Sequence, residues 1–189
     1  YEYILIDGKS NDKSVEVINK YIDNIDTFIS EKDESMYHAI NKGIQAAKGE
    51  VIIWINSDDI LDKNAVLNVS NFFKKNSKVQ WISGINGYIK KNLKFSGIPY
   101  IYPRFFLKRG YAEHTLWGFV QQESVSFRKS LYKKVGGFDY KYNKLCDYGL
   151  WVSFSKITFL QTVFFKIGFF RSWDGQESKV NRLLTFQSI

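Results

Sequence analysis

The stretch that decides the fold is residues 51–59, Val-Ile-Ile-Trp-Ile-Asn-Ser-Asp-Asp, in which five apolar residues are followed by four polar ones. An uninterrupted apolar run of this length is typical of a strand that is covered on both faces. We therefore predict a buried strand over residues 51–55 that ends in a polar turn. Because ligands bind beyond the carboxyl ends of the strands in open parallel sheets, residues 56–59 lie where a ligand is expected.

Strand and helix patterns alternate on both sides of this run. The expected strands of the first half are residues 3–6, 27–30 and 79–83, and apolar residues at helical spacing predict helices over residues 15–22, 37–48 and 62–73. The second half is less regular, with strands expected over 124–127 and within 157–170, and helices over 128–135 and 147–155. We predict an α/β fold, with a mostly parallel sheet flanked by helices. No repeat or linker interrupts the 189 residues, which favours a single domain.

The composition limits the class of protein. A hydrophobic content of 44% makes disorder unlikely, and the net charge of +8 favours anionic partners such as nucleotides, phospholipid surfaces or nucleic acid. A solvated basic surface explains the charge equally well. No RNP-like or basic-helix pattern occurs, so we expect no nucleic-acid partner. Cys146 is the only cysteine, which favours an intracellular setting, and the longest apolar run, residues 159–170, is too short to span a bilayer.

Asp58 and Asp59 are the first candidates for chemistry because they follow the predicted buried strand. Two adjacent carboxylates can share one divalent cation and one sugar hydroxyl, and hard cations such as Mg²⁺ prefer carboxylate oxygens. The competing interpretation is an ordinary turn or a helix cap, and the residues alone leave both interpretations open. A glycoside hydrolase is disfavoured because its two carboxylates face each other across the substrate.

Two further carboxylates also have two interpretations. Asp7 follows the strand over residues 3–6, and with Gly8 it could bind a nucleoside or simply form a turn that ends at Asp12. Asp147 opens a predicted helix, where it could serve as a general base or only cap the helix. Position alone favours the structural interpretation for both residues.

Each motif alone is unspecific, but the motifs together, in their order along the chain, are specific. They are residues 7–12 (Asp-Gly-Lys-Ser-Asn-Asp), 29–33, 37–43, 56–59, 122–124 (Gln-Glu-Ser), 135–139 (Val-Gly-Gly-Phe-Asp) and 147–151 (Asp-Tyr-Gly-Leu-Trp). In this order the set resembles family 2 glycosyltransferases with the GT-A fold, and the resemblance runs through almost the whole chain. It implies residues 1–83 as a nucleotide-sugar-binding half and residues 84–189 as an acceptor-binding half.

The resemblance implies an inverting transfer of a sugar from a nucleotide diphosphate sugar, with Mn²⁺ or Mg²⁺ as cofactor. Asp7 would contact the nucleoside, and Asp33 and Asn41 would line the same pocket. Asp58 would hold the ribose or the sugar. Asp59 would ligate the metal on the diphosphate.

On the acceptor side, the resemblance makes Asp147 the base that deprotonates the acceptor hydroxyl. Gln122 and Glu123 would shape this side, with Trp117 and Trp151 as surfaces on which a sugar stacks. The acceptor would be a saccharide or a lipid-linked saccharide. The expected location is the cytoplasm, with peripheral contact at the inner face of the membrane.

The sequence also departs from the family pattern. The family normally has another strand and helix ahead of Tyr1, so we expect an N-terminally truncated chain whose sheet lacks its first strand and has a gap there. Lys9 and Asn11 stand where Gly and Thr are common, and Gly149 stands where a second Asp is frequent. The alternative function is a non-catalytic GT-A-like module that binds sugar or lipid.

Overall fold

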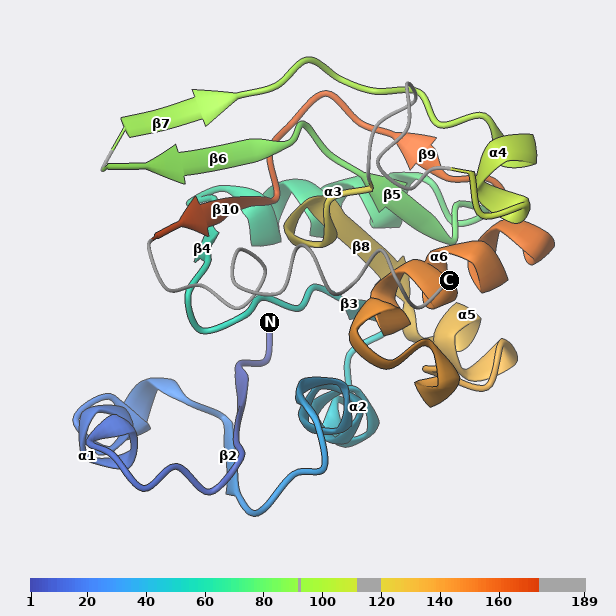
Figure 1. Cartoon of the computed structure of the whole chain (residues 1–189). Helices are drawn as coiled ribbons and strands as arrows, with labels where there is room; N and C mark the ends of the chain where they lie inside the picture. Colours follow the sequence, from blue (N-terminus) through green and yellow to red (C-terminus); the bar gives the residue numbers. More distant parts are fainter. Residues whose placement is uncertain (92, 112–119, 174–189) are drawn as a thin grey trace.

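The computed structural model describes residues 1–91, 93–111 and 120–173, and Figure 1 shows its sheets with helices on both sides. The N-terminal unit is a two-stranded parallel sheet of β1 (Ile4–Asp7) and β2 (Thr27–Ser30). α1 (Ser14–Asn19) and a short 3-10 turn (Ile22–Asn24) connect the two strands. The strands predicted at 3–6 and 27–30 are thus confirmed, with a shorter helix between them.

A four-stranded sheet forms the centre of the molecule, in the order β3-β8-β5-β9. Its strands are β3 (Val51–Ile52), β8 (Val125–Arg128), β5 (Trp81–Ser83) and β9 (Gln161–Thr162). β8 runs antiparallel to both β3 and β5, whereas β9 is parallel to β5. The predicted strand over 51–55 is therefore paired only at its beginning, and residues 53–55 lead out of the sheet towards the polar turn.

The third sheet has the order β4-β10-β6-β7. It contains β4 (Ile60–Leu61), β10 (Gly168–Ser172), β6 (Gly87–Lys90) and β7 (Leu93–Ser96). Only the β10–β6 pair of this sheet is parallel.

The α/β class is confirmed, but the expectation of a mostly parallel sheet is wrong. Three of the seven strand pairings among the described residues are parallel. The alternation of strands and helices in the first half suggested parallel crossovers throughout. In the second half of the chain, β8 instead runs antiparallel to its neighbours β3 and β5, and β6 and β7 form an antiparallel hairpin. Antiparallel pairs of this kind need no crossover helix.

Helices cover both faces of the central sheet, because neighbouring residues of a strand point to opposite faces. Ile82 of β5 packs with α3 (Ala65–Lys75), and Trp81 packs on the other face with α2 (Met36–Ala46), α5 (Lys129–Lys134) and α6 (Cys146–Ile157). α4 (Arg104–Lys108) lies against α6. None of the described helices is long and apolar enough to cross a bilayer.

α2 joins the N-terminal unit to the rest. Its Gly43 lies against Ile6 of β1, where an added Cβ would come within 3.3 Å of the Ile6 side chain, while Tyr37 and Ile44 belong to the main core. In the described part of the chain, β1 and β3 belong to different sheets. The expected interruption of the sheet is therefore present between these two strands.

Candidate functional site

The Asp58-Asp59 turn lies between β3 and β4 and is held in place by the end of β10. The amide of Asp59 donates to the Asn56 carbonyl at 3.1 Å, which closes the turn. The Asp59 carboxylate accepts from the backbone amide of Arg171 at 2.8 Å, and Asp58 accepts from the indole of Trp173 at 3.3 Å. The Arg171 guanidinium also donates to the Asp58 carbonyl. These contacts fix the turn against the end of β10.

A second carboxyl group meets Asp59 from another part of the chain. Glu123 lies in the short 3-10 turn Gln122–Ser124, is 5% exposed and is hydrogen-bonded to Asp59. Burial raises the pKa of Asp59, and burial together with the negative charge of Asp59 raises the pKa of Glu123 to about 8. Since the first ionisation disfavours the second, the pair retains a proton at neutral pH.

Gln122 explains why the two segments meet. Its amide donates to the carbonyl of Trp54 at 2.9 Å and accepts from the side chain of Asn56 at 3.0 Å. These bonds attach the turn before β8 to the extended residues that follow β3. Gln122 and Glu123 were predicted on the acceptor side, and the structure places both of them directly against the Asp58-Asp59 turn.

The paired carboxyl groups fit a hard divalent cation. A cation held by Asp59 and Glu123 would replace the shared proton and balance the negative charge that burial disfavours. No cluster of three or more His, Cys, Asp or Glu that could hold a metal occurs within residues 1–91, 93–111 and 120–173. The two carboxylates would therefore leave most coordination positions to water and to ligand phosphates, as is usual for Mg²⁺. Glu123 could not be recognised as a ligand from the sequence, because it lies far from Asp59 along the chain.

Asp7 is the last residue of β1, and hydrogen bonds from two serine hydroxyls hold its carboxylate in place. Its carboxylate accepts from the hydroxyls of Ser10 at 2.5 Å and Ser30 at 2.6 Å. These bonds, chiefly the one from Ser10, lower the pKa of Asp7. Gly8 beside it approaches Asp33 so closely that an added Cβ would lie 3.3 Å from the Asp33 carboxylate. The structure thus brings the predicted nucleoside residues Asp7 and Asp33 together.

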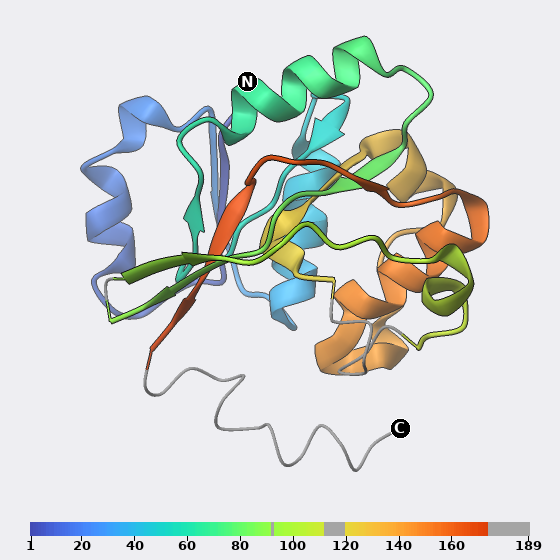
Figure 2. The same ribbon diagram turned by 90° about the horizontal axis from the view of Figure 1, so that it is seen from above.

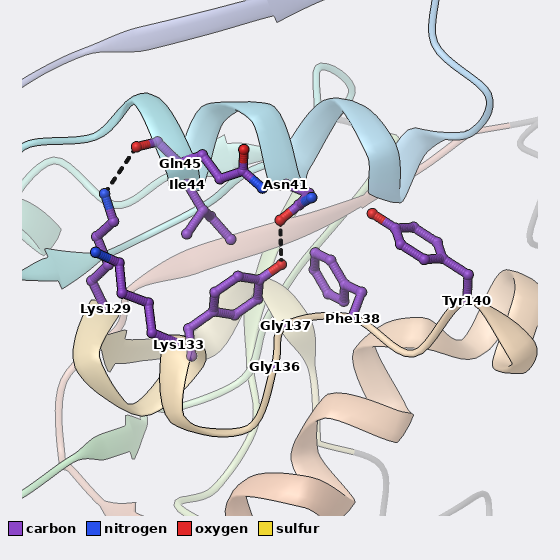
Figure 3. Close-up of a pocket in the computed structure, with 10 residues that line it drawn as sticks. Asn41, Ile44, Gln45, Lys129, Lys133, Gly136, Gly137, Phe138 and Tyr140 are labelled. Atoms are coloured by element: carbon purple, nitrogen blue, oxygen red, sulfur yellow. Dashed lines mark hydrogen bonds between the residues drawn. The ribbon is translucent and has the colours of Figure 1, made fainter.

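Asn41 faces a different place. Its side chain accepts from the Tyr132 hydroxyl at 2.9 Å, across a pocket of about 370 Å³ between α2 and α5 (Figure 3). The next residue, Lys42, points instead to Asp33, and the ammonium lies 2.6 Å from that carboxylate. The structure therefore does not bring Asn41 together with Asp33. Successive residues of a helix are rotated by about 100°, so the two side chains leave α2 in different directions.

Asp147 lies in the first turn of α6 and is buried. Its carboxylate accepts from the Tyr37 hydroxyl of α2 at 2.9 Å. One turn further along α6, the Trp151 ring stacks on Trp54 with a centroid distance of 5.5 Å. Because Trp54 precedes the Asp58-Asp59 turn by only a few residues, this contact fixes the start of α6 relative to that turn.

The prediction that Trp151 provides a sugar-stacking surface is wrong. Trp151 is 1% exposed, and its ring lies between those of Trp54 and Trp81, at 5.5 and 5.7 Å. Both faces of the ring are therefore occupied by protein. The second predicted stacking residue, Trp117, lies outside the described residues.

A family of known proteins matches most of the chain. The family described as Glycosyl transferase family 2 matches residues 1–136. A PGL/p-HBAD biosynthesis glycosyltransferase of Mycobacterium bovis is 21% identical over 152 residues, which cover 78% of this chain and 56% of that protein.

Two solved structures share the fold. S. aureus TarS 1–349 in complex with UDP has a TM-score of 0.67 at 14% identity, over 99% of this chain and 56% of that one. The mannosyltransferase PcManGT from Pyrobaculum calidifontis, in complex with GDP-Man and Mn²⁺, has a TM-score of 0.60 at 16% identity, over 95% of this chain and 50% of that one. The chain thus spans about half the length of the proteins it matches.

Proposed function

The chain belongs to glycosyltransferase family 2, and from this premise we propose that it forms the catalytic domain of an inverting, metal-dependent hexosyltransferase. The donor is a nucleotide diphosphate sugar. Residues 1–83 form the donor half of the domain, and residues 84–189 form the acceptor half. The observation that carries the proposal is the hydrogen-bonded Asp59–Glu123 pair, in which Glu123 is buried, because two such carboxyl groups are suited to a cation on the donor diphosphate.

On the donor side, Asp7 and Asp33 bind the nucleoside, since Asp7 ends β1 and Asp33 lies beyond the end of the neighbouring parallel strand β2, against Gly8. Asp58 holds the ribose or the sugar, and Asp59 with Glu123 holds Mn²⁺ or Mg²⁺. When bound, the cation neutralises charge on the leaving diphosphate. Support for this donor class comes from the UDP and the GDP-Man in the two similar structures.

On the acceptor side, Asp147 accepts the proton of the attacking hydroxyl. The hydroxyl oxygen then bonds to the sugar carbon opposite the departing diphosphate, which inverts that carbon. Tyr37 orients the Asp147 carboxylate through its hydrogen bond at 2.9 Å. Gln122 shapes the floor between donor and acceptor. The acceptor is a saccharide or lipid-linked saccharide, and the enzyme works in the cytoplasm with peripheral contact at the inner membrane face.

The experiment that tests the proposal is hydrolysis or transfer of labelled nucleotide sugars with Mn²⁺, in wild type and Asp147→Asn. We expect the variant to lose activity by about 1,000-fold or more, because the amide cannot take up the proton. The matched control is Asp139→Asn, which changes a carboxylate in the preceding turn that is paired with Lys141. The control should keep wild-type activity. Equal activity of wild type and Asp147→Asn would contradict the role of Asp147.

The second candidate is a non-catalytic module of the same fold that binds sugar or lipid. It is favoured by the N-terminal unit, since β1 pairs only with β2 among the described residues and α1 buries none of its side chains. Such a module would bind saccharide without metal and would show no activity that depends on Asp147.

A further inference from the structure

The strongest unexplained feature is an apolar surface formed by two segments, residues 97–111 and residues 156–166, which we name the basic apolar face. The first segment leads from β7 through α4, and the second leads from the end of α6 past β9. The two segments lie side by side in both views (Figures 1 and 2). The Thr162 hydroxyl donates to the Tyr100 carbonyl at 2.6 Å, and Arg104 donates to the Ser155 carbonyl at 2.6 Å.

The exposed apolar side chains of this face do not result from loose packing, because their neighbours in the chain are buried. Tyr102, Leu107 and Val163 point into the protein and are each less than 9% exposed. The side chains that point outward are each at least 54% exposed, and they are Ile98, Ile101, Phe105, Phe159 and Phe164. An exposed apolar patch fixed in this way usually marks an interaction site.

All charged side chains within residues 97–111 and 156–166 are cations. The sequence contains no Asp or Glu from Lys63 to Ala112 or from Tyr148 to Trp173. The cations of the face are Arg104, Lys108, Arg109, Lys156 and Lys166. None of them forms an ion pair within the part of the chain that the structure describes.

Cations and rings alternate closely on the surface. The guanidinium of Arg109 lies 3.9 Å from the Phe105 ring centroid, and that of Arg104 lies 4.7 Å from the Phe159 ring centroid. Phe105 and Phe159 could enter a hydrocarbon layer, and each of them is next to a cation that could pair with a phosphate. This arrangement is the one expected where a protein rests on a bilayer with anionic headgroups.

We propose that the basic apolar face docks on anionic phospholipid headgroups, with Phe105 and Phe164 inserted between them. A second copy of the chain would bring cations against cations, and a neutral apolar partner would leave the cations unpaired. The inference rests on the proposed function for the membrane contact of the enzyme, and it names the surface that makes this contact.

Cosedimentation of the full chain with vesicles tests the proposal without nucleotide, metal or acceptor. The vesicles are phosphatidylcholine alone, or phosphatidylcholine mixed with phosphatidylglycerol, both at physiological salt. We expect binding to the mixed vesicles and little binding to phosphatidylcholine alone. Phe105→Ser with Phe164→Ser, and separately Lys108→Glu with Arg109→Glu, should each weaken binding at least about tenfold.

The matched control is Tyr21→Ser with Lys20→Glu, which removes an aromatic ring and a cation from the N-terminal unit. Tyr21 is 61% exposed, and α1, which it follows, lies far from α4 in Figures 1 and 2. The control should bind mixed vesicles like the wild type, and thermal melts should show all variants folded. Equal binding to both vesicle types, or full binding by both double variants, would overturn the proposal. Absence of sugar transfer would count against the proposed function alone, because vesicle binding does not depend on it.

Discussion

The N-terminal unit and the aromatic core around α6 are built by different physical means. In residues 1–36, Asp7 is the only buried residue, and the unit is held by two short parallel strands, serine hydroxyls and an ion pair. The core around α6 contains stacked and edge-on rings that are almost fully buried, including Trp81, Phe127 and Phe154. The region assigned to the donor thus contributes polar groups, whereas the aromatic core supplies the stability that holds the Asp58-Asp59 turn and Asp147 in place.

The largest expected effect is on stability, at the centre of the core. Trp151→Ala removes a ring that is packed between two others, and we expect a loss of about 4 kcal/mol of unfolding free energy. Chemical denaturation measures it. If Trp151 were instead an accessible acceptor surface, the variant would unfold like the wild type and lose only acceptor binding.

The second prediction concerns pH at the edge of the core. Because the pKa of Glu123 is higher in the folded chain than its ordinary value, the protonated form favours folding. This contribution is present below about pH 4.5 and is lost as the pH rises towards about 8. Glu123→Gln should therefore be more stable than the wild type at pH 8, on the order of 2 kcal/mol, and nearly equal to it at pH 5.

Thermal melts of both proteins at pH 5 and pH 8 measure this difference. Mn²⁺ should stabilise the wild type at pH 8 and have little effect on Glu123→Gln, because the cation takes the place of the shared proton. A wild type whose stability relative to the variant does not change with pH would show that the Asp59–Glu123 pair is not coupled in this way.

The smallest expected effect on stability lies in the N-terminal unit. Asp33→Asn removes the charge that pairs with Lys42, which retains Glu31 at 2.7 Å. The melting temperature should stay within about 3 °C of the wild type, while nucleotide binding weakens by about tenfold. Calorimetric titration with UDP and GDP measures the second value. A large loss of stability with unchanged nucleotide binding would show that Asp33 stabilises the fold and does not bind the donor, which would contradict the difference between the two regions.

Much of the architecture follows from periodicity in the sequence. Alternating patterns located β1, β2 and α2, and the helical spacing of Leu150, Trp151 and Phe154 indicated a buried face of α6. Periodicity was the better guide at Trp151, where the family resemblance suggested an exposed ring. The direction of β8 could not be predicted, because a short apolar strand looks the same in either direction.

The sequence indicated single candidate residues of the site, but it did not indicate which of them contact each other in the folded chain. The polar turn after the apolar run indicated Asp58 and Asp59 as candidates, and the start of α6 indicated Asp147. The partnership of Asp59 with Glu123 depends on how β8 enters the sheet next to β3, which no local pattern encodes. The direction of Asn41 depends likewise on the rotation of α2 against its neighbours.

The central claim is that the Asp58-Asp59 turn forms the metal end of a nucleotide-sugar site. The most direct test measures the melting temperature with UDP, GDP or dTDP, in the presence and absence of Mn²⁺, for wild type and Asp59→Asn. We predict that at least one nucleotide raises the melting temperature of the wild type by several degrees only when Mn²⁺ is present, and that Asp59→Asn shows no such rise. Unchanged melting of the wild type with all three nucleotides and Mn²⁺ would contradict the claim.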